Sequence, residues 1–547
     1  MTESLLPALL IVAPILGATV SLALGVVRER TGWTVAALVL AVEAALASWL
    51  AYAVYYGRDH ADGIRHVLGG ETFGRKDVVI GVGPSAGQRT ENFIVGIELV
   101  ADEFSGLVVM LVAVVALAVL AFSRQAGPRG NAFYSGYLLL TGGLMGVALT
   151  GDLFNLFVFL EIVGLATYAL IASGESGESA VAALKYLIIG TTGASMYLIG
   201  VGYLFVRTGA LNMVDVARSL AGEPSWIEGA LYGDPLVAAA FGFIAAGLAA
   251  KAAIYPLHTW QPDAYAAAPD AVTVYISALA STSAAYALAR VTWTVFRPAF
   301  FEVHVLMLNG LLVLAALSVL VGSFLAAMQR RIKRTFAYSS VAQFGLIVLG
   351  IGIAVHPSST EAATTFAVYG VAIHLVAHGL IKGGLFATAG AFARAADART
   401  VSDYAGLAKK HPLLAGSFAV LGFSIVGVPP TVGFIGKWYL AVASVESGLW
   451  PVVLVVFAST LLTLLYVAQL LEKLYFDYLP EDEPAHAQSS AAVATDGGRR
   501  LPLGILALAV GAAVLSLALG FAGGELTELV DPVARRLFED PEVILND

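Results

Sequence analysis

The 547-residue sequence contains no cysteine. It can therefore form no disulfide bond, no thiolate zinc site and no cysteine-ligated iron–sulfur cluster. Any redox chemistry associated with this chain must be carried by another subunit. We expect the chain to hold no cofactor and no metal of its own.

Charged residues are scarce as well. Aspartate, glutamate, lysine and arginine make up only 13% of the chain, whereas 59% of its residues are hydrophobic and the mean hydropathy is +0.83. An average soluble domain carries about 25% charged residues, so this composition does not suit a water-soluble fold. The formal net charge of −9 is modest for the length and gives no reason to expect a nucleic-acid partner.

Long apolar runs occupy most of the sequence. Lipid offers no water to backbone N–H and C=O groups, so a membrane-spanning segment must be a helix of about 20 apolar residues or part of a closed barrel. The runs here are long and uninterrupted, which predicts an all-α polytopic membrane protein. Hydropathy in windows of about 19 residues places about fourteen helices near residues 4–27, 33–56, 103–123, 133–150, 153–173, 181–207, 236–257, 271–294, 303–328, 335–355, 364–393, 413–445, 450–477 and 501–523.

The polar stretches between these runs are few. Residues 57–101 contain glycine and β-forming residues and predict a small hairpin outside the membrane. Residues 478–500 combine acidic and small side chains, which is typical of a flexible linker. The first apolar run lacks a basic segment before it and has full spanning length, so we expect a retained helix and not a cleaved signal peptide.

Lysine and arginine residues gather in the loops that follow odd-numbered helices. Short cytoplasmic loops carry an excess of these residues, so we expect these loops on the cytoplasmic side of the cell membrane and both termini outside. The residues are Arg28, Arg30, Arg124, Arg129, Arg330, Arg331, Lys333, Arg334, Arg394, Arg399, Lys409, Lys410, Arg499 and Arg500.

Several ionisable residues lie inside the predicted helices. Such a residue costs about 2.5–3.5 kcal/mol on insertion scales and by default marks a functional pathway. A single one is also explained by a structural ion pair or by a side chain that reaches the membrane surface, but a whole series is not. The series consists of Glu161, Lys185, Lys251, His374, His378, Lys382 and Lys437.

Three of these residues follow one another at helical spacing. His374, His378 and Lys382 stand at i, i+4 and i+8, so they line one stripe of a single helix. Two histidines four apart also suit a metal site. However, no carboxylate or third histidine accompanies them locally, and the lysine would repel a cation. The spacing therefore favours a ladder of proton-exchanging groups.

Two predicted helices carry proline beside their lysine. Lys251 is followed by Pro256, and Lys437 is preceded by Pro429 and Pro430. A proline kink that serves packing explains one such break better than two, and paired broken helices are typical of inverted-repeat transporters. The breaks fall in the seventh and twelfth helices and predict two inverted repeats of five helices. The expected units are residues 1–130 (helices 1–3), 131–300 (first repeat, helices 4–8), 301–478 (second repeat, helices 9–13) and 479–547 (linker, helix 14 and tail).

Glu161 and Lys185 lie on successive predicted helices. Burial favours the neutral form of each group, whereas a neighbouring opposite charge restores the ionised forms. Such a pair is stabilised as ions when the side chains meet and favours proton release when they separate. We therefore expect these two residues to form a charge switch.

Six stretches together resemble the proton-conducting membrane transporter family. This family includes complex I antiporter-like subunits, Mrp-type Na+/H+ antiporter subunits and membrane-bound hydrogenase subunits. The resemblance covers about residues 100–440 and rests on DLFNLFVFLEI, ALKYLIIG, KAAIYPLHTWQPDAYAAAP, KRTFAYSSVAQFG, HLVAHGLIKGGLF and GVPPTVGFIGKWYL. It implies that Glu161 and Lys185 are the coupling pair of a first half-channel with Lys251 at its centre. Lys382 would be the central lysine of the second half-channel, and Lys437 its outward-opening terminal residue.

Two positions depart from many relatives in this family. Thr282 stands where many have a bridging lysine, and Gln343 stands where some have histidine. Thr282 can relay a proton only through its hydroxyl group or a water molecule, which leaves the link between the half-channels open. Thr282, Gln343 and His258 are candidate relays.

Within the family, NLFVFLEI and the lysine of GFIGKWYL are most similar to the D-type subunits of Mrp antiporters. This similarity implies a proton-translocating subunit of a multisubunit Na+/H+ antiporter, not an enzyme, with other membrane subunits as its partners. An alternative is a proton-pumping membrane subunit of an NADH-quinone oxidoreductase or a membrane-bound hydrogenase. An alternative of another class is a stand-alone transporter of a small solute, which would need a roomy midplane pocket.

Overall fold

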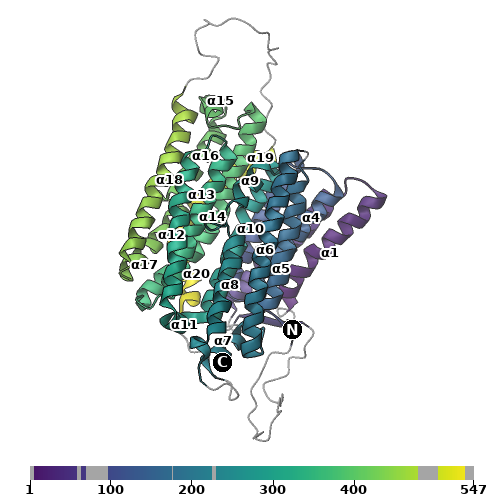
Figure 1. Ribbon diagram of the computed structural model, residues 1–547. Helices are drawn as coiled ribbons and strands as arrows, with labels where there is room; N and C mark the ends of the chain where they lie inside the picture. The colour runs from purple at the N-terminus through teal and green to yellow at the C-terminus, as the bar shows by residue number, and fades with distance from the viewer. Residues whose placement is uncertain are drawn as a thin grey trace, which may run out of the picture.

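The computed structural model of the chain describes residues 5–57, 63–68, 96–174, 176–223, 229–477 and 503–535. Within these ranges the chain is a bundle of helices that run between two ends of the molecule (Figure 1). Twelve described helices are long and apolar enough to cross a membrane. They are α1 (Leu6–Val27), α2 (Gly32–Tyr56), α3 (Glu103–Ala126), α4 (Asn131–Leu149), α5 (Leu153–Ala172), α6 (Gly177–Thr208), α10 (Asp270–Val291, continued by a π-helical turn, Thr292–Phe296, and by α11, Arg297–Val303), α12 (Val305–Ala327), α13 (Ile332–Ala354), α14 (Glu361–Ala396), α18 (Trp450–Phe476) and α19 (Leu503–Phe521).

The other two predicted spans are broken helices. The seventh span is α8 (Pro235–Lys251), followed by a non-helical turn and α9 (Trp260–Ala267). The twelfth is α16 (Pro412–Val426), followed by a short break and α17 (Val432–Glu446). The predictions of an all-α polytopic membrane protein and of breaks in these two spans are thus confirmed. The division into two inverted repeats stays a prediction.

The remaining described elements are short and lie at the ends of the bundle. β1 (Ile64–Leu68) pairs with β2 (Ile97–Ala101) in an antiparallel register that runs from Ile64 opposite Ala101 to Leu68 opposite Ile97. This pairing confirms the hairpin expected within residues 57–101, whereas residues 58–62 and 69–95 lie outside the described residues and the position outside the membrane stays a prediction. One end of the bundle carries α7 (Met213–Ala221), α11 and α20 (Gly523–Arg535), and the other carries α15 (Leu407–Lys410) (Figure 1). The predicted linker, residues 478–500, lies outside the described residues.

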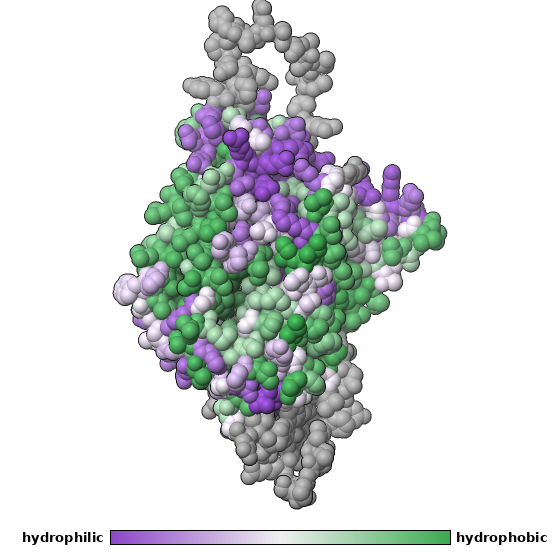
Figure 2. All heavy atoms as spheres, in the orientation of Figure 1, coloured by the Kyte–Doolittle hydropathy of each residue, from purple (hydrophilic) through white to green (hydrophobic). Residues whose placement is uncertain are grey.

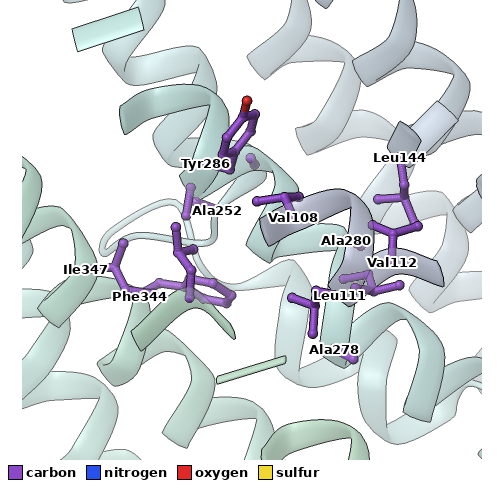
Figure 3. Close-up of a cluster of buried hydrophobic side chains, with 14 of the residues drawn as sticks. Val108, Leu111, Val112, Leu144, Ala252, Ala278, Ala280, Tyr286, Phe344 and Ile347 are labelled. Carbon is purple, nitrogen blue, oxygen red and sulfur yellow. The ribbon is translucent and has the colours of Figure 1, made fainter. Parts of the chain in front are cut away.

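Helix α10 is the centre of the bundle. In the span that begins with α10, all residues of its most apolar 18-residue stretch are buried inside the bundle. The buried share of the corresponding stretch is 94% in α13 but only 28% in α2. Figure 3 shows part of the core, in which α3, α4 and α13 surround α10 at Ala278, Ala280 and Tyr286. Small residues allow close approach of the helices. For example, Gly379 of α14 packs so close to α10 that a Cβ atom there would lie 3.0 Å from the carbonyl oxygen of Ala278. The central helices can therefore hold polar groups away from lipid.

The surface of the molecule is apolar around the middle and polar at the ends. Figure 2 shows hydrophobic side chains over the flank of the bundle and hydrophilic ones concentrated at its ends. Large exposed apolar side chains occur along the peripheral helices, for example Leu38 on α2, Leu306 on α12 and Leu454 on α18. A soluble protein would not expose so many of them together, so this flank is the surface that contacts lipid or neighbouring subunits.

Candidate functional site

The break after α8 places Lys251 beside Glu161. Lys251 is the last residue of α8, its side chain is only 7% exposed, and its Nζ lies 2.9 Å from Oε1 of Glu161 on α5. The same ammonium donates to the carbonyl of Leu160 at 3.3 Å. The indole N–H of Trp260 donates to the carbonyl of Ala250 at 2.9 Å, which holds the start of α9 against the end of α8. An ion pair therefore joins α5 to the broken span inside the bundle.

Lys185 has a different partner from the one that the sequence suggested. Its Nζ lies 2.6 Å from Oδ2 of Asp263 on α9, and Oδ1 of the same carboxylate lies 3.0 Å from Arg334 of α13. In this structure Lys185 therefore contacts Asp263 and Glu161 contacts Lys251, and the charge switch expected between Glu161 and Lys185 stays a prediction. The physical reason is the break, because the turn after α8 returns the chain as α9 and brings a nearer carboxylate to α6.

His258 occupies the turn between α8 and α9. It is buried, and its ring centroid lies 5.5 Å from that of Tyr255 and 6.0 Å from that of Tyr338 on α13. No described residue forms a hydrogen bond with its Nδ1 atom. This placement, between the first broken span and α13, is compatible with the relay role suggested for His258.

Thr282 links the central helix α10 to α14. Its hydroxyl donates to the carbonyl of Ala278 at 2.8 Å and lies 3.3 Å from Nδ1 of His378. A hydroxyl has one proton to donate, so the threonine oxygen accepts from an Nδ1–H group of His378. The other ring nitrogen of His378, Nε2, has no partner among the described residues. Thr282 thus contacts the stripe on α14 through its hydroxyl group, and its role as a relay stays a prediction.

The stripe on α14 is present, but its three members bond to other helices and not to one another. His374 Nε2 lies 3.1 Å from Oε1 of Gln343 on α13. Lys382 donates to the carbonyl of Phe336 at 2.9 Å and to the hydroxyl of Ser339 at 2.7 Å. The hydroxyl of Ser339 lies 2.6 Å from that of Tyr466 on α18. Helix α13 therefore supplies a second polar row that runs antiparallel to the stripe.

Lys437 caps the broken end of α16. Its Nζ donates to the carbonyls of Ile425 and Val426 at 2.7 and 3.1 Å. The last carbonyls of a helix lack intrahelical partners and carry partial negative charge, so a cation is stabilised there. The helix ends at Val426 and is followed by Gly427, whose φ of +92° suits glycine. A Cβ atom at Gly436 would lie 2.8 Å from Cβ of His374, so α17 packs tightly against α14 at that histidine.

The buried groups differ in the partners that hold them. Lys251 meets a carboxylate, Lys382 meets a hydroxyl and a carbonyl, and Lys437 meets two carbonyls. His374 and His378 meet an amide oxygen and a hydroxyl. Each of these groups can gain or lose a proton, and the described part of the chain gathers no group of three or more metal-binding side chains around them. The arrangement suits proton exchange.

Sequence reasoning missed several polar residues that the structure adds. Asp263 was visible as a lone carboxylate soon after the proline of the break, in HTWQPDAY. Lys333 and Arg334 were assigned only to a cytoplasmic loop, yet Lys333 pairs with Asp270 at 2.6 Å and Arg334 pairs with Asp263. Ser339 lies in the motif KRTFAYSSVAQFG, but nothing in the motif distinguishes it from its neighbour.

Residues 150–463 match the family described as NADH:quinone oxidoreductase/Mrp antiporter, TM. Among known proteins, NADH-quinone oxidoreductase subunit N of Desulforudis audaxviator is 42% identical over 436 residues, which cover 77% of this chain and 82% of that protein. The D-type subunit of the Na(+)/H(+) antiporter of Bacillus subtilis is 32% identical over 378 residues, which cover 69% of this chain and 72% of that protein.

Two solved structures are similar over nearly the whole chain. The Mrp complex from Dietzia sp. contains a chain with a TM-score of 0.81 and 27% identity, with 100% of both chains covered. The membrane-bound sulfane sulfur reductase, an archaeal respiratory membrane complex, contains a chain with the same TM-score and identity, with 99% of both covered. Together with the match over more than half of the sequence, these likenesses place the chain in the NADH:quinone oxidoreductase/Mrp antiporter family of membrane subunits.

Proposed function

We propose that the chain is the proton-translocating subunit of a multisubunit membrane complex, similar to the D-type subunit of a cation/proton antiporter. The observation that carries the proposal is the series of buried ionisable side chains through the bundle. The series begins at the pair of Lys251 and Glu161, passes His378 and Lys382 on α14, and ends at Lys437. Family membership supports the same function.

The proposed orientation follows the distribution of basic residues. The basic residues lie at the same end of the bundle as α15 (Figure 1). They are those in the loops after α1, α3 and α12, together with Arg394 and Lys410. Short loops rich in lysine and arginine face the cytoplasm. We therefore infer that this end is cytoplasmic, that both termini face outward, and that protons enter near Lys185 and Asp263.

The proposed switch uses Glu161 as a movable counter-charge. In this structure it neutralises Lys251, while Asp263 holds Lys185. An ion pair stabilises the protonated form of a buried lysine, and loss of the partner favours proton release. Movement of Glu161 from Lys251 toward Lys185 would thus release a proton from Lys251 toward the central helix.

A second candidate function is a proton-pumping subunit of an NADH-quinone oxidoreductase. The specific observation in its favour is the 42% identity with a protein named as subunit N of that enzyme, against 32% with the D-type antiporter subunit. The two functions use the same buried residues and differ in the partner subunits that drive or use the proton movement.

The deciding experiment measures the intact complex, purified from its native membranes and reconstituted into vesicles. Under the first function, a Na+ gradient moves protons without any reductant. Under the second, protons move only when NADH and a quinone are supplied. Proton movement under neither condition, in vesicles whose complex contains all its subunits, would contradict both functions and favour a solute transporter.

A further inference from the structure

A carboxylate outside the series described above is buried without a partner. Glu43 lies near the middle of α2, in the run AALVLAVEAALASWL, and is 0% exposed. Neither of its side-chain oxygens has a hydrogen-bond partner among the described residues. Its neighbour Val42 is 54% exposed on the lipid-facing side of α2, so the face of α2 that carries Glu43 is the one that points into the bundle. The residue lies outside the segment 150–463 that matches the family.

The usual structural explanations do not fit Glu43. It stands eleven residues after Gly32 and thirteen before Tyr56, the ends of α2. At about 1.5 Å per residue these separations are roughly 16 and 20 Å, too far for a short side chain to reach either membrane surface. No salt bridge of the described residues includes it. A charged carboxylate would be uncompensated here, and buried groups in that situation neutralise.

One polar group that interacts with Glu43 belongs to the central helix. The phenol of Tyr275 on α10 lies within electrostatic reach of Glu43, beyond hydrogen-bond distance. Its oxygen lies 2.7 Å from the hydroxyl of Thr141 on α4, which itself donates to the carbonyl of Tyr137 at 3.0 Å. Thr141 has then no second proton to give, so Tyr275 donates to it, and the phenol oxygen keeps a lone pair that a proton from the carboxyl would reach through an intervening water molecule.

The same helix leads from this network to the proposed pathway. Tyr275 and Thr282 are seven residues apart on α10, so they lie on the same side, two turns and about 10 Å apart. Thr282 contacts His378 of the α14 stripe. A buried acid, a phenol and a hydroxyl thus follow one another from the peripheral helix α2 to the centre of the bundle.

We propose that Glu43 is a proton-binding site, carried inside the membrane as the neutral carboxylic acid, which exchanges its proton with the hydroxyl groups on α10. The binding of the proton stands on burial and on the missing counter-charge alone. Only the exchange with α10 rests on the proposed function. The ligand is a proton, and the same chemistry makes the group a target for lipophilic carbodiimides.

The first test is infrared spectroscopy of the purified complex. The difference spectrum between wild type and Glu43→Gln should contain the C=O stretching band of a protonated carboxylic acid. The matched control is Glu178→Gln, because Glu178 has a side chain that is 69% exposed, and its difference spectrum should contain only carboxylate bands. A Glu43 difference spectrum with carboxylate bands alone would overturn the proposal.

A second measurement needs no substitution and therefore no assumption about folding. The acid O–H adds across one C=N bond of dicyclohexylcarbodiimide: the carboxyl oxygen bonds to carbon and the proton goes to nitrogen. The acyl group then migrates to nitrogen, and no atom leaves. Mass spectrometry of labelled membranes should find this adduct on Glu43 with the lipophilic reagent but not with a water-soluble carbodiimide. Labelling by the water-soluble reagent alone would contradict a neutral acid in the membrane interior.

The exchange is tested by proton flux in reconstituted vesicles. Glu43→Gln should lower the flux well below that of Glu178→Gln, with the complex assembled, and Glu43→Asp should restore part of it. Wild-type flux in Glu43→Gln would overturn the exchange. Loss of flux in Lys251→Ala in the same experiment separates this failure from failure of the proposed function itself.

Discussion

The ammonium of Lys251 lies 2.9 Å from a carboxylate oxygen of Glu161, although ninety residues separate the two in sequence. The contact exists because α8 ends at Lys251 and leaves its side chain facing α5. It joins a helix that is continuous through the membrane to one that is broken. A change in this ion pair can therefore be coupled to movement of the broken segment, which carries Asp263 and His258 with it.

Replacement of Lys251 by alanine should abolish proton transport and leave the complex assembled. The change removes the group that accepts the proton at the break. Glu161 is 23% exposed on its side chain, so it can neutralise or turn to water when its partner is lost. The measurement is proton flux in vesicles, with subunit content checked on the same preparation. Lys473→Ala is the matched control, because Lys473 pairs with Asp477 near the end of α18, outside the buried series. Equal flux in both variants would exclude the role given to Lys251.

Glu161 should tolerate aspartate better than glutamine. Asp keeps an ionisable group near Lys251, whereas Gln preserves the size and removes the charge. We expect near-background flux for Glu161→Gln and partial flux for Glu161→Asp, measured in the same vesicles. If the two variants are equally active, the side chain serves packing and the charge switch is wrong.

Asp263 should prove as necessary as the residues that the motifs indicated. Asp263→Asn removes the negative charge that Lys185 and Arg334 share. The control variant Asp263→Glu retains this negative charge. These side chains are about one-third exposed, and ion pairs of this kind contribute less than about 1 kcal/mol to stability. A large loss of flux in the Asn variant with unchanged thermal stability would then report on transport. Wild-type flux would mean that the cluster only fixes α9 against α6 and α13.

The sequence predicted the spans well because lipid leaves the backbone a single solution within an apolar run. Prolines at 256 and at 429 and 430 marked both breaks correctly. The sequence did not predict the partners of the buried groups as well. The carboxylate that binds Lys185 lies 78 residues away, on a segment whose direction depends on the turn after Lys251. Glu43 carries the same local signal as Glu161, a single carboxylate in an apolar run, but no family motif contains it.

Gly436 should be intolerant of any side chain. A Cβ atom there would lie 2.8 Å from Cβ of His374 and 3.0 Å from its backbone Cα and N atoms, so backbone would have to move. Overpacking of this kind costs about 1–3 kcal/mol, and Gly436→Ala should lower thermal stability accordingly. Gly416→Ala is the control, since a Cβ atom at Gly416 meets nothing within 4 Å. Thermal unfolding of the detergent-solubilised complex compares the two. Similar melting temperatures would mean that α17 is not held tightly against α14.

The contact of Thr282 with His378 gives a direct test of the passage between α10 and α14. Thr282→Val preserves the shape and removes the hydroxyl that lies 3.3 Å from the histidine, so we expect a strong loss of flux. Thr282→Ser restores the hydroxyl and should restore flux. A Val variant as active as the Ser variant would show that protons cross elsewhere.

His378 is the middle member of the stripe on α14. Neighbouring members stand four residues apart, about 6 Å along the helix, so loss of His378 opens a gap of roughly 12 Å between His374 and Lys382. A hydrogen bond of about 3 Å cannot span this gap, and water would have to fill it. His374 and Lys382 already bond to α13, so neither is drawn toward the gap.

His378→Leu fills the space with an apolar group and excludes water, which should cut proton flux strongly. His378→Asn keeps polar atoms that can bond to Thr282 or to a water molecule, and it should retain part of the flux. Both variants are compared in vesicles with equal amounts of assembled complex. If the Leu and Asn variants both transport protons at nearly the wild-type rate, the pathway does not follow this face of α14. The histidine would then serve only to join α14 to α10 through its bond with Thr282.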